Sequence, residues 1–159
     1  MKSLLQNDRI MTPIMVVVAI GAGALVNYIG DRLLGVRLEL FWGVSTFSVW
    51  WVLDLFLVPF IAGMTVSLIY GLGGKILCYF APIVTRVISY VQMHNYQDLP
   101  DGVFVLPIYY WVMVLIVAIE AAAFGGVIGE VLIKRTYGRR PRHLVYKSSS
   151  DDKSSDTRN

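Results

Sequence analysis

Three charged residues lie inside long apolar stretches of this sequence: Asp54, Arg86 and Glu120. Asp54 lies within WWVLDLFLVP and is the only charged residue between Glu39 and Lys75. A charged side chain at membrane depth is costly, so it usually faces a partner, a polar cavity or a proton pathway. These three residues are therefore the candidate intramembrane polar site. The chemistry open to them is ion pairing, proton transfer or transport.

Little other chemistry is encoded. His94 and His143 are the only histidines, they fall in separate segments, and Cys78 is the only cysteine, so no zinc-ligand spacing occurs. The GLGGK stretch lacks the full spacing of a phosphate-binding Walker loop, and no GxSxG motif is present. There is also no basic surface with interspersed aromatic residues of the kind that binds nucleic acid. We expect no enzymatic activity, no metal, no cofactor and no nucleic-acid partner.

The composition indicates a membrane protein. Hydrophobic residues make up 56% of the 159 residues and charged residues only 16%, whereas about a quarter of a soluble domain is charged. Four apolar segments approach the ~20 residues that cross a bilayer as a helix: 10–30, 48–70, 75–93 and 106–133. We predict an all-α bundle of four transmembrane helices in residues 1–135. The third segment is the weakest, since it contains Pro82 and Arg86. Residues 136–159 are first basic and then rich in Ser and Asp, which predicts a disordered tail.

The N-terminus has two interpretations. Lys2 and Arg9 precede an apolar run, and Ala22–Ala24 resembles the cleavage site of a secretory signal. Further spans follow, however, so we favour an uncleaved first transmembrane helix. Thr12 followed by Pro13 suits the start of that helix, because proline is tolerated in the first turn.

Charged residues between the segments predict the orientation. The loop 94–102 contains Asp98 and Asp101 but no Lys or Arg, so it is expected outside, together with the loop 31–40. Both termini are expected in the cytoplasm, and the protein in a bacterial inner membrane. Basic residues after the fourth segment carry the strongest signal and could also attract anionic lipid headgroups: Lys134, Arg135, Arg139, Arg140 and Arg142.

Depth in the membrane suggests a partner for Asp54. Trp50 and Trp51 are expected at the outer interface, and Arg86 should reach a similar depth on the next, antiparallel helix. We therefore predict an Asp54–Arg86 ion pair. One interpretation is a lock between the second and third helices, and the other is the outer mouth of a path leading to Glu120. Pro59 would free the carbonyl of Leu55 beside the pair, and we interpret it as a plain kink rather than a binding site.

Small residues predict where helices pack. Ala121, Gly125 and Gly129 are spaced four apart on the fourth segment, and Ala19 and Gly23 offer a similar stripe on the first. Such stripes let two helices approach closely. We expect the first helix to pack on the fourth, and the alternative is a seam between copies of the chain.

Two glutamates on the fourth segment have different expected roles. Glu120, near its middle, could carry protons or, as a protonated acid, could hydrogen-bond one of three polar side chains: Asn27, Thr65 or Ser67. Glu130 lies near the cytoplasmic end, where it could pair with Lys134 or Lys75. We interpret Glu130 as structural.

The absence of catalytic motifs and the presence of packing stripes favour one function class. We expect a non-catalytic membrane subunit, scaffold or assembly factor of a larger membrane complex. Its expected partners are the lipid bilayer and other integral membrane subunits or further copies of the chain. The alternative is a small oligomeric transporter or channel that uses Asp54, Arg86 and Glu120.

Overall fold

Four helices dominate the computed structural model, which describes residues 2–71, 73–95, 99 and 101–137. Each of the four is long and apolar enough to cross a membrane, which confirms the prediction of four long apolar helices. The helices are α1 (Lys2–Leu34), α2 (Val49–Tyr70), α4 (Phe80–His94) with the short α3 (Gly74–Leu77) before it, and α5 (Ile108–Tyr137).

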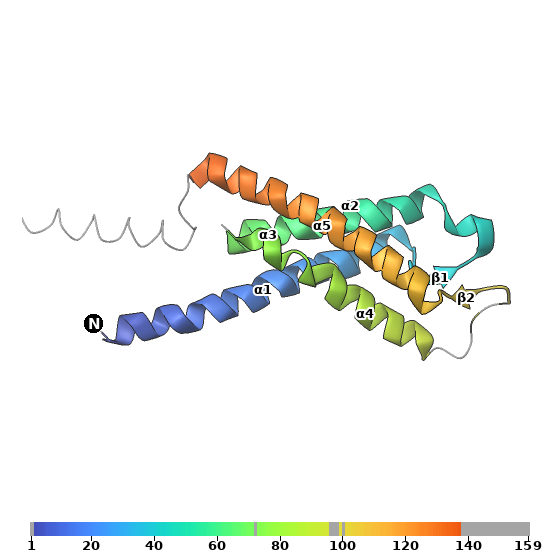
Figure 1. The fold of residues 1–159 in the computed structure, drawn as a ribbon, viewed down its shortest axis with the longest axis horizontal. Coiled ribbons are helices and arrows are strands. Elements are labelled where there is room, and N and C mark those ends of the chain that lie inside the picture. Colours follow the sequence, from blue (N-terminus) through green and yellow to red (C-terminus); the bar gives the residue numbers. More distant parts are fainter. Residues whose placement is uncertain (1, 72, 96–98, 100, 138–159) are drawn as a thin grey trace, which may run out of the picture.

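The helices form one bundle with α2 as its shared partner. Helix α2 packs along α5 and also against α1, and α4 contacts α1, α2 and α5. In Figure 1 the N-terminal end of α1 and the C-terminal end of α5 lie at the left, and the two strands lie at the right. The connections before α2 and before α5 therefore meet at the opposite end of the bundle from the two termini of the described chain.

A small sheet joins those two connections. Strand β1 (Leu40–Phe41) pairs antiparallel with β2 (Phe104–Val105), with Leu40 opposite Val105. The Leu106 amide also donates to the Glu39 carbonyl at 2.9 Å. The two segments that we expected on the same side of the membrane are thus held together, and Glu39 is fixed beside the helix ends.

The Trp- and Ser-rich stretch before α2 forms a short 3-10 turn, η1 (Gly43–Thr46), and then a capped helix start. The hydroxyl of Ser48 accepts a hydrogen bond from the Trp51 amide at 3.2 Å, which satisfies one of the free amides of the first turn. Helix α2 continues through Pro59, which is buried. It ends at Gly71, whose φ of 92° is unfavourable for residues with a side chain.

The helix boundaries differ from the predicted ones in two places. Helix α1 begins at Lys2 and ends at Leu34, so Pro13 lies inside it and Asp31 belongs to its last turn rather than to a loop. The third span is interrupted by a turn at Cys78 and Tyr79, between α3 and α4. Pro82 explains the interruption, because it has no amide hydrogen to donate to the carbonyl of Cys78.

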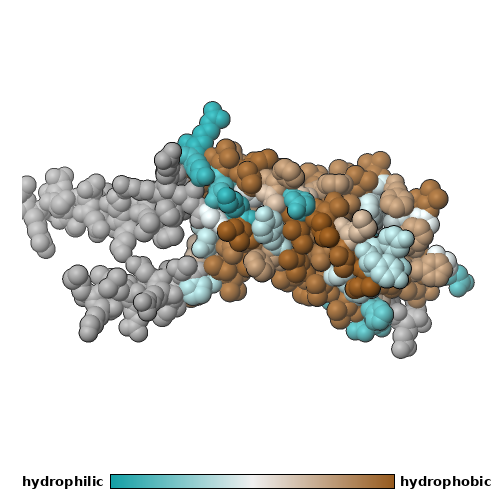
Figure 2. Space-filling view, in the orientation of Figure 1, coloured by the Kyte–Doolittle hydropathy of each residue, from teal (hydrophilic) through white to brown (hydrophobic). Residues whose placement is uncertain are grey.

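Many of the buried positions in this bundle hold small residues. Small residues such as Ala19, Ala62 and Ala122 are fully buried, while Val17 and Phe124 are about two-thirds exposed. Brown, hydrophobic side chains accordingly cover most of the face seen in Figure 2. Close packing through small residues, with large apolar residues outside, is the pattern expected of helices surrounded by lipid.

Candidate functional site

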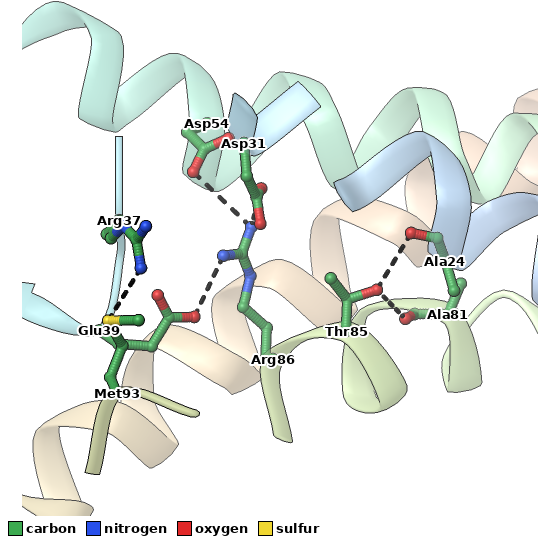
Figure 3. A network of polar contacts seen from close by, with 9 residues as sticks. All are labelled: Ala24, Asp31, Arg37, Glu39, Asp54, Ala81, Thr85, Arg86 and Met93. Atoms are coloured by element: carbon green, nitrogen blue, oxygen red, sulfur yellow. Dashed lines mark hydrogen bonds and ion pairs between the residues drawn. The ribbon is translucent and has the colours of Figure 1, made fainter. Parts of the chain in front are cut away.

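Arg86 is the centre of the most polar region inside the bundle. It lies on α4 beside Thr85, whose hydroxyl donates to the carbonyls of Ala81 at 3.1 Å and Ala24 at 3.3 Å. The second bond holds α4 against α1. The Arg86 side chain is only 1% exposed, and its guanidinium points between α1, α2 and the segment that leads to β1 (Figure 3).

Three carboxylates from three different segments surround this guanidinium. Asp31 on α1 accepts a hydrogen bond from Nη2 at 2.7 Å, and Glu39, just before β1, accepts one from Nη1 at 3.3 Å. Asp54 on α2 lies 3.7 Å from Nη2, within ion-pair range but beyond a hydrogen bond. We call Arg86, Asp31, Glu39 and Asp54 the Arg86 cluster. It ties α1, α2, α4 and the β1 segment to one side chain.

The sequence identified only two members of the cluster. It brought Asp54 and Arg86 together by depth, but it assigned Asp31 and Glu39 to an aqueous loop. The signal for Asp31 was helical spacing, because it follows Gly23 and Asn27 at intervals of four and so continues the buried face of α1. Glu39 is flanked by the apolar residues Leu38 and Leu40, all three buried. No rule of sequence spacing predicts that Glu39, which follows α1 in a loop, contacts Arg86 on α4.

Charge in the cluster is unbalanced, since three carboxylates share one cation. Asp54 is fully buried and neither of its oxygens accepts a hydrogen bond from the described residues. The guanidinium donates through Nη1 to Glu39 and through Nη2 to Asp31, while its buried Nε has no hydrogen-bond partner among the described residues. The arrangement therefore acts first as a link between segments, and removal of its single cation would leave three uncompensated acids.

The pH dependence of stability should report on Glu39, which lies outside the apolar helices. Burial raises the pKa of Glu39 above its ordinary value of 4.5, against a smaller lowering by Arg86. The folded state then binds this proton more tightly than the unfolded state. The contribution of Glu39 to stability is complete below pH 4.5 and is lost as the pH rises through the folded-state pKa.

Glu39→Gln keeps an oxygen that can accept from Arg86 but does not titrate. The free energy of unfolding of the detergent-solubilised protein is measured from below pH 4.5 to neutral pH. It should decrease less in Glu39→Gln than in the unsubstituted protein. Superimposable pH profiles of the two proteins would contradict this expectation.

Glu120 is not part of this region. Its side chain is exposed on α5, and the described residues offer it neither an ion pair nor a hydrogen bond. None of the three polar partners considered for it reaches it. Thr65 donates to the carbonyl of Ile61, Ser67 contacts Cys78, and Asn27 is fully buried without a hydrogen bond to the described residues. Glu120 and the Arg86 cluster therefore do not line one continuous path.

Glu130 has a structural contact that the sequence did not predict. Its side chain is 7% exposed and its Oε1 accepts a hydrogen bond from the Gly73 amide at 2.6 Å. The carboxylate thereby fixes the glycine turn between α2 and α3. Lys75 and Lys134, the expected partners, are exposed, and neither forms an ion pair with Glu130 in the described part of the chain.

The small-residue stripes do pack helices, but the predicted pairing of the first helix with the fourth is wrong. A Cβ added at Gly125 would meet the backbone of Phe60 on α2, and one at Gly129 would come within 2.9 Å of the Met64 carbonyl. A Cβ at Gly23 would instead meet Val66 on α2 and Ala81 on α4. Helix α2 contacts both stripes, which also contain the buried residues Ala19 and Ala121.

The predicted lipid-headgroup residues and the predicted tail lie partly outside the described residues. Lys134 and Arg135 are exposed in the last turn of α5, while Arg139, Arg140 and Arg142 are not among the residues described, nor is most of the tail 136–159.

The described residues contain no group of three or more His, Cys, Asp or Glu side chains placed to hold a metal ion. Comparison with protein-family models, curated proteins and solved structures gives no match for this chain.

Proposed function

We propose that this chain is a non-catalytic subunit or scaffold of a larger membrane complex, and that the exposed face of α5 binds the next subunit. The observation that carries the proposal is Glu120. It is exposed near the middle of the apolar span Ile108–Thr136. A carboxylate that faces hydrocarbon costs a few kcal/mol, so a partner that covers it is strongly favoured.

The residues around Glu120 have the spacing of a helix–helix contact. Exposed apolar side chains precede and follow it at intervals of three or four, as in a packing seam: Met113, Ile116, Phe124, Val127 and Val131. Each is at least 48% exposed. The stripe of small residues on α5 is already occupied by α2, whereas the Glu120 face belongs to the exposed surface of α5.

Charge selects the kind of partner. Among the described residues, Arg86 is engaged by three carboxylates, and Lys75 lies at the beginning of a span rather than near its middle. A second copy of the chain therefore offers no free cation at the depth of Glu120. We infer a different membrane protein, with a basic side chain on the facing helix.

The orientation belongs to the same proposal. Lys134 and Arg135 follow the apolar part of α5, and the predicted cytoplasmic tail continues with further basic residues. The positive-inside rule then favours a cytoplasmic position for both termini, and we propose a bacterial inner membrane as the location. The Arg86 cluster and the small sheet lie at the outer end of the bundle in this arrangement.

A small oligomeric transporter is the alternative function. It would need Asp54, Arg86 and Glu120 along one polar path, whereas Glu120 is exposed on the outside of α5 and Asp54 is fully buried. The geometry therefore favours the subunit. Loss of ion or solute flux in both Asp54→Asn and Glu120→Gln, with the assembly unchanged, would reverse this preference.

The test is the size of the native assembly in mild detergent. The unsubstituted chain, extracted from its own membranes, should migrate as a complex larger than the purified chain. Glu120→Leu should release the chain as a smaller species, and Glu120→Gln should retain part of the complex because it keeps hydrogen bonding. Phe56→Leu, on the exposed face of α2, is the matched control. Migration as a lone chain in unsubstituted membranes would refute the proposal, as would a complex insensitive to Glu120→Leu.

A further inference from the structure

A polar cavity of about 470 Å³ lies between the C-terminal ends of α1 and α4, next to the Arg86 cluster. This volume falls within the range of small-ligand sites. Charged and amide or hydroxyl side chains dominate its walls, among them Asp31, Arg32, Arg37, Glu39, Ser89 and Gln92. Arg32, Arg37 and Gln92 are exposed, so the cavity is open to the surface.

The inner wall of the cavity is acidic. Asp31 and Glu39 both line it, and both share the single guanidinium of Arg86 with Asp54. Helices α1 and α4 also end there, at Leu34 and His94, and the free carbonyls of a helix C-terminus carry partial negative charge. This wall favours a cation, and one with N–H donors would satisfy the carboxylate oxygens.

The outer rim of the cavity is basic. The Arg32 guanidinium lies 5.0 Å from the centre of the Tyr28 ring, and Arg37 donates to the sulfur of Met93 at 3.1 Å. Neither arginine forms an ion pair with a carboxylate of the described residues. Figure 3 shows Arg37 directed toward Met93, while Glu39 forms its ion pair with Arg86. Two guanidiniums without acidic partners suit an anion with several oxygens, and phosphate fits their planar fork best.

The position of the cavity along the spans agrees with a membrane-interface ligand. Its residues come from the last two turns of the spans Pro13–Leu34 and Gly74–His94 and from the segment 35–39. Exposed apolar side chains lie just below it on both helices, with Ile29 at 46% and Ile88 at 52% exposed. A headgroup in the cavity could therefore extend its acyl chains along α1 and α4.

We propose that this cavity binds a zwitterion of the phosphoethanolamine class. The primary ammonium lies against Asp31 and Glu39, and the phosphate lies against Arg32 and Arg37. The same chemistry is offered by the headgroup of phosphatidylethanolamine and by soluble phosphoethanolamine. A choline headgroup fits less well because its quaternary ammonium has no N–H to donate, and a glycerol headgroup lacks the cation.

Lipid retention in native mass spectrometry tests the proposal. The purified full-length chain is given equal amounts of phosphatidylethanolamine, phosphatidylcholine and phosphatidylglycerol with identical acyl chains, and phosphatidylethanolamine should be retained preferentially. Arg32→Gln should reduce that retention by roughly tenfold, the effect of losing one charge-assisted contact. Asp31 also holds Arg86, so its substitution would confound folding with binding, whereas Arg32 is exposed. Lys75→Gln, which removes an exposed positive charge at the other end of the bundle, is the control and should leave the retention of phosphatidylethanolamine unchanged.

Competition separates the two sources of the ligand. Displacement of bound phosphatidylethanolamine by soluble phosphoethanolamine would assign the site to the free molecule, and resistance to displacement would assign it to the lipid. Equal retention of the three lipids would overturn the proposal. Undiminished retention of phosphatidylethanolamine in Arg32→Gln would also overturn it.

Discussion

Arg86→Gln should be the most destabilising single substitution in the bundle, with a loss of about 3–5 kcal/mol in the free energy of unfolding. The substitution removes the only cation among three carboxylates, two of which are at most 3% exposed. It also removes the hydrogen bonds through which Arg86 links the β1 segment and α1 to α4. The measurement is unfolding of the protein in mixed micelles as the fraction of denaturing detergent increases.

The three acidic partners should not contribute equally. Asp31→Asn weakens a 2.7 Å charge-assisted hydrogen bond, whereas Asp54→Asn removes a charge that has only a 3.7 Å ion pair. Asp31→Asn should therefore destabilise the protein, and Asp54→Asn should cost less or even stabilise it by relieving repulsion among the acids. In double-mutant cycles, the coupling of Arg86 to Asp31 should exceed its coupling to Asp54. Equal coupling energies would contradict this order.

Gly125→Ala should destabilise the protein by about 1–3 kcal/mol, the usual cost of overpacking. The new methyl group would overlap the carbonyl of Phe60, and its distance to the carbonyl carbon would be 2.8 Å. The obstacle is backbone, so no side chain can rotate away and α2 and α5 must separate. Gly63 faces the Ala122 carbonyl in the same manner from the other helix, and Gly63→Ala should have a similar effect.

Gly21→Ala is the matched control for this prediction. Gly21 lies on α1 in an exposed position, and an added Cβ would meet nothing within 4 Å. Alanine is favoured over glycine inside a helix, so Gly21→Ala should be neutral or slightly stabilising. Unfolding in the same detergent series compares the two variants. Equal stability of Gly125→Ala and Gly21→Ala would show that α2 and α5 are not in close contact.

The helices could be predicted from sequence because each has a long apolar run. Their packing partners could not, because small-residue stripes show that a helix packs closely but do not name its neighbour. The stripe with Gly125 therefore suggested the first helix, whereas α5 packs against Phe60 and Met64 of α2. Both α2 and α5 contain glycines that permit close packing, but only the fold shows that Gly63 and Gly125 lie in the same helix–helix contact.

Only part of the polar site could be predicted from the sequence. Depth arguments apply to residues within spans, so Asp54 and Arg86 could be brought to one level. Glu39 reaches Arg86 from a segment whose path is set by pairing of β1 with β2, and such pairing leaves no signal in two-residue strands. The direction of Glu120 depended on which face of α5 contacts α2, which hydrophobic periodicity does not distinguish when both faces are apolar.

Site-specific photo-crosslinking in native membranes can show whether the Glu120 face of α5 contacts a different membrane protein, as we propose. A photoreactive residue at Phe124, one turn from Glu120 and 67% exposed, is compared with one at Phe56 on α2, which is 50% exposed. We expect a discrete protein adduct from position 124 whose mass is not that of two copies of the chain, and loss of that adduct in Glu120→Leu. Adducts only with lipid, or equal protein adducts from positions 124 and 56, would contradict the claim.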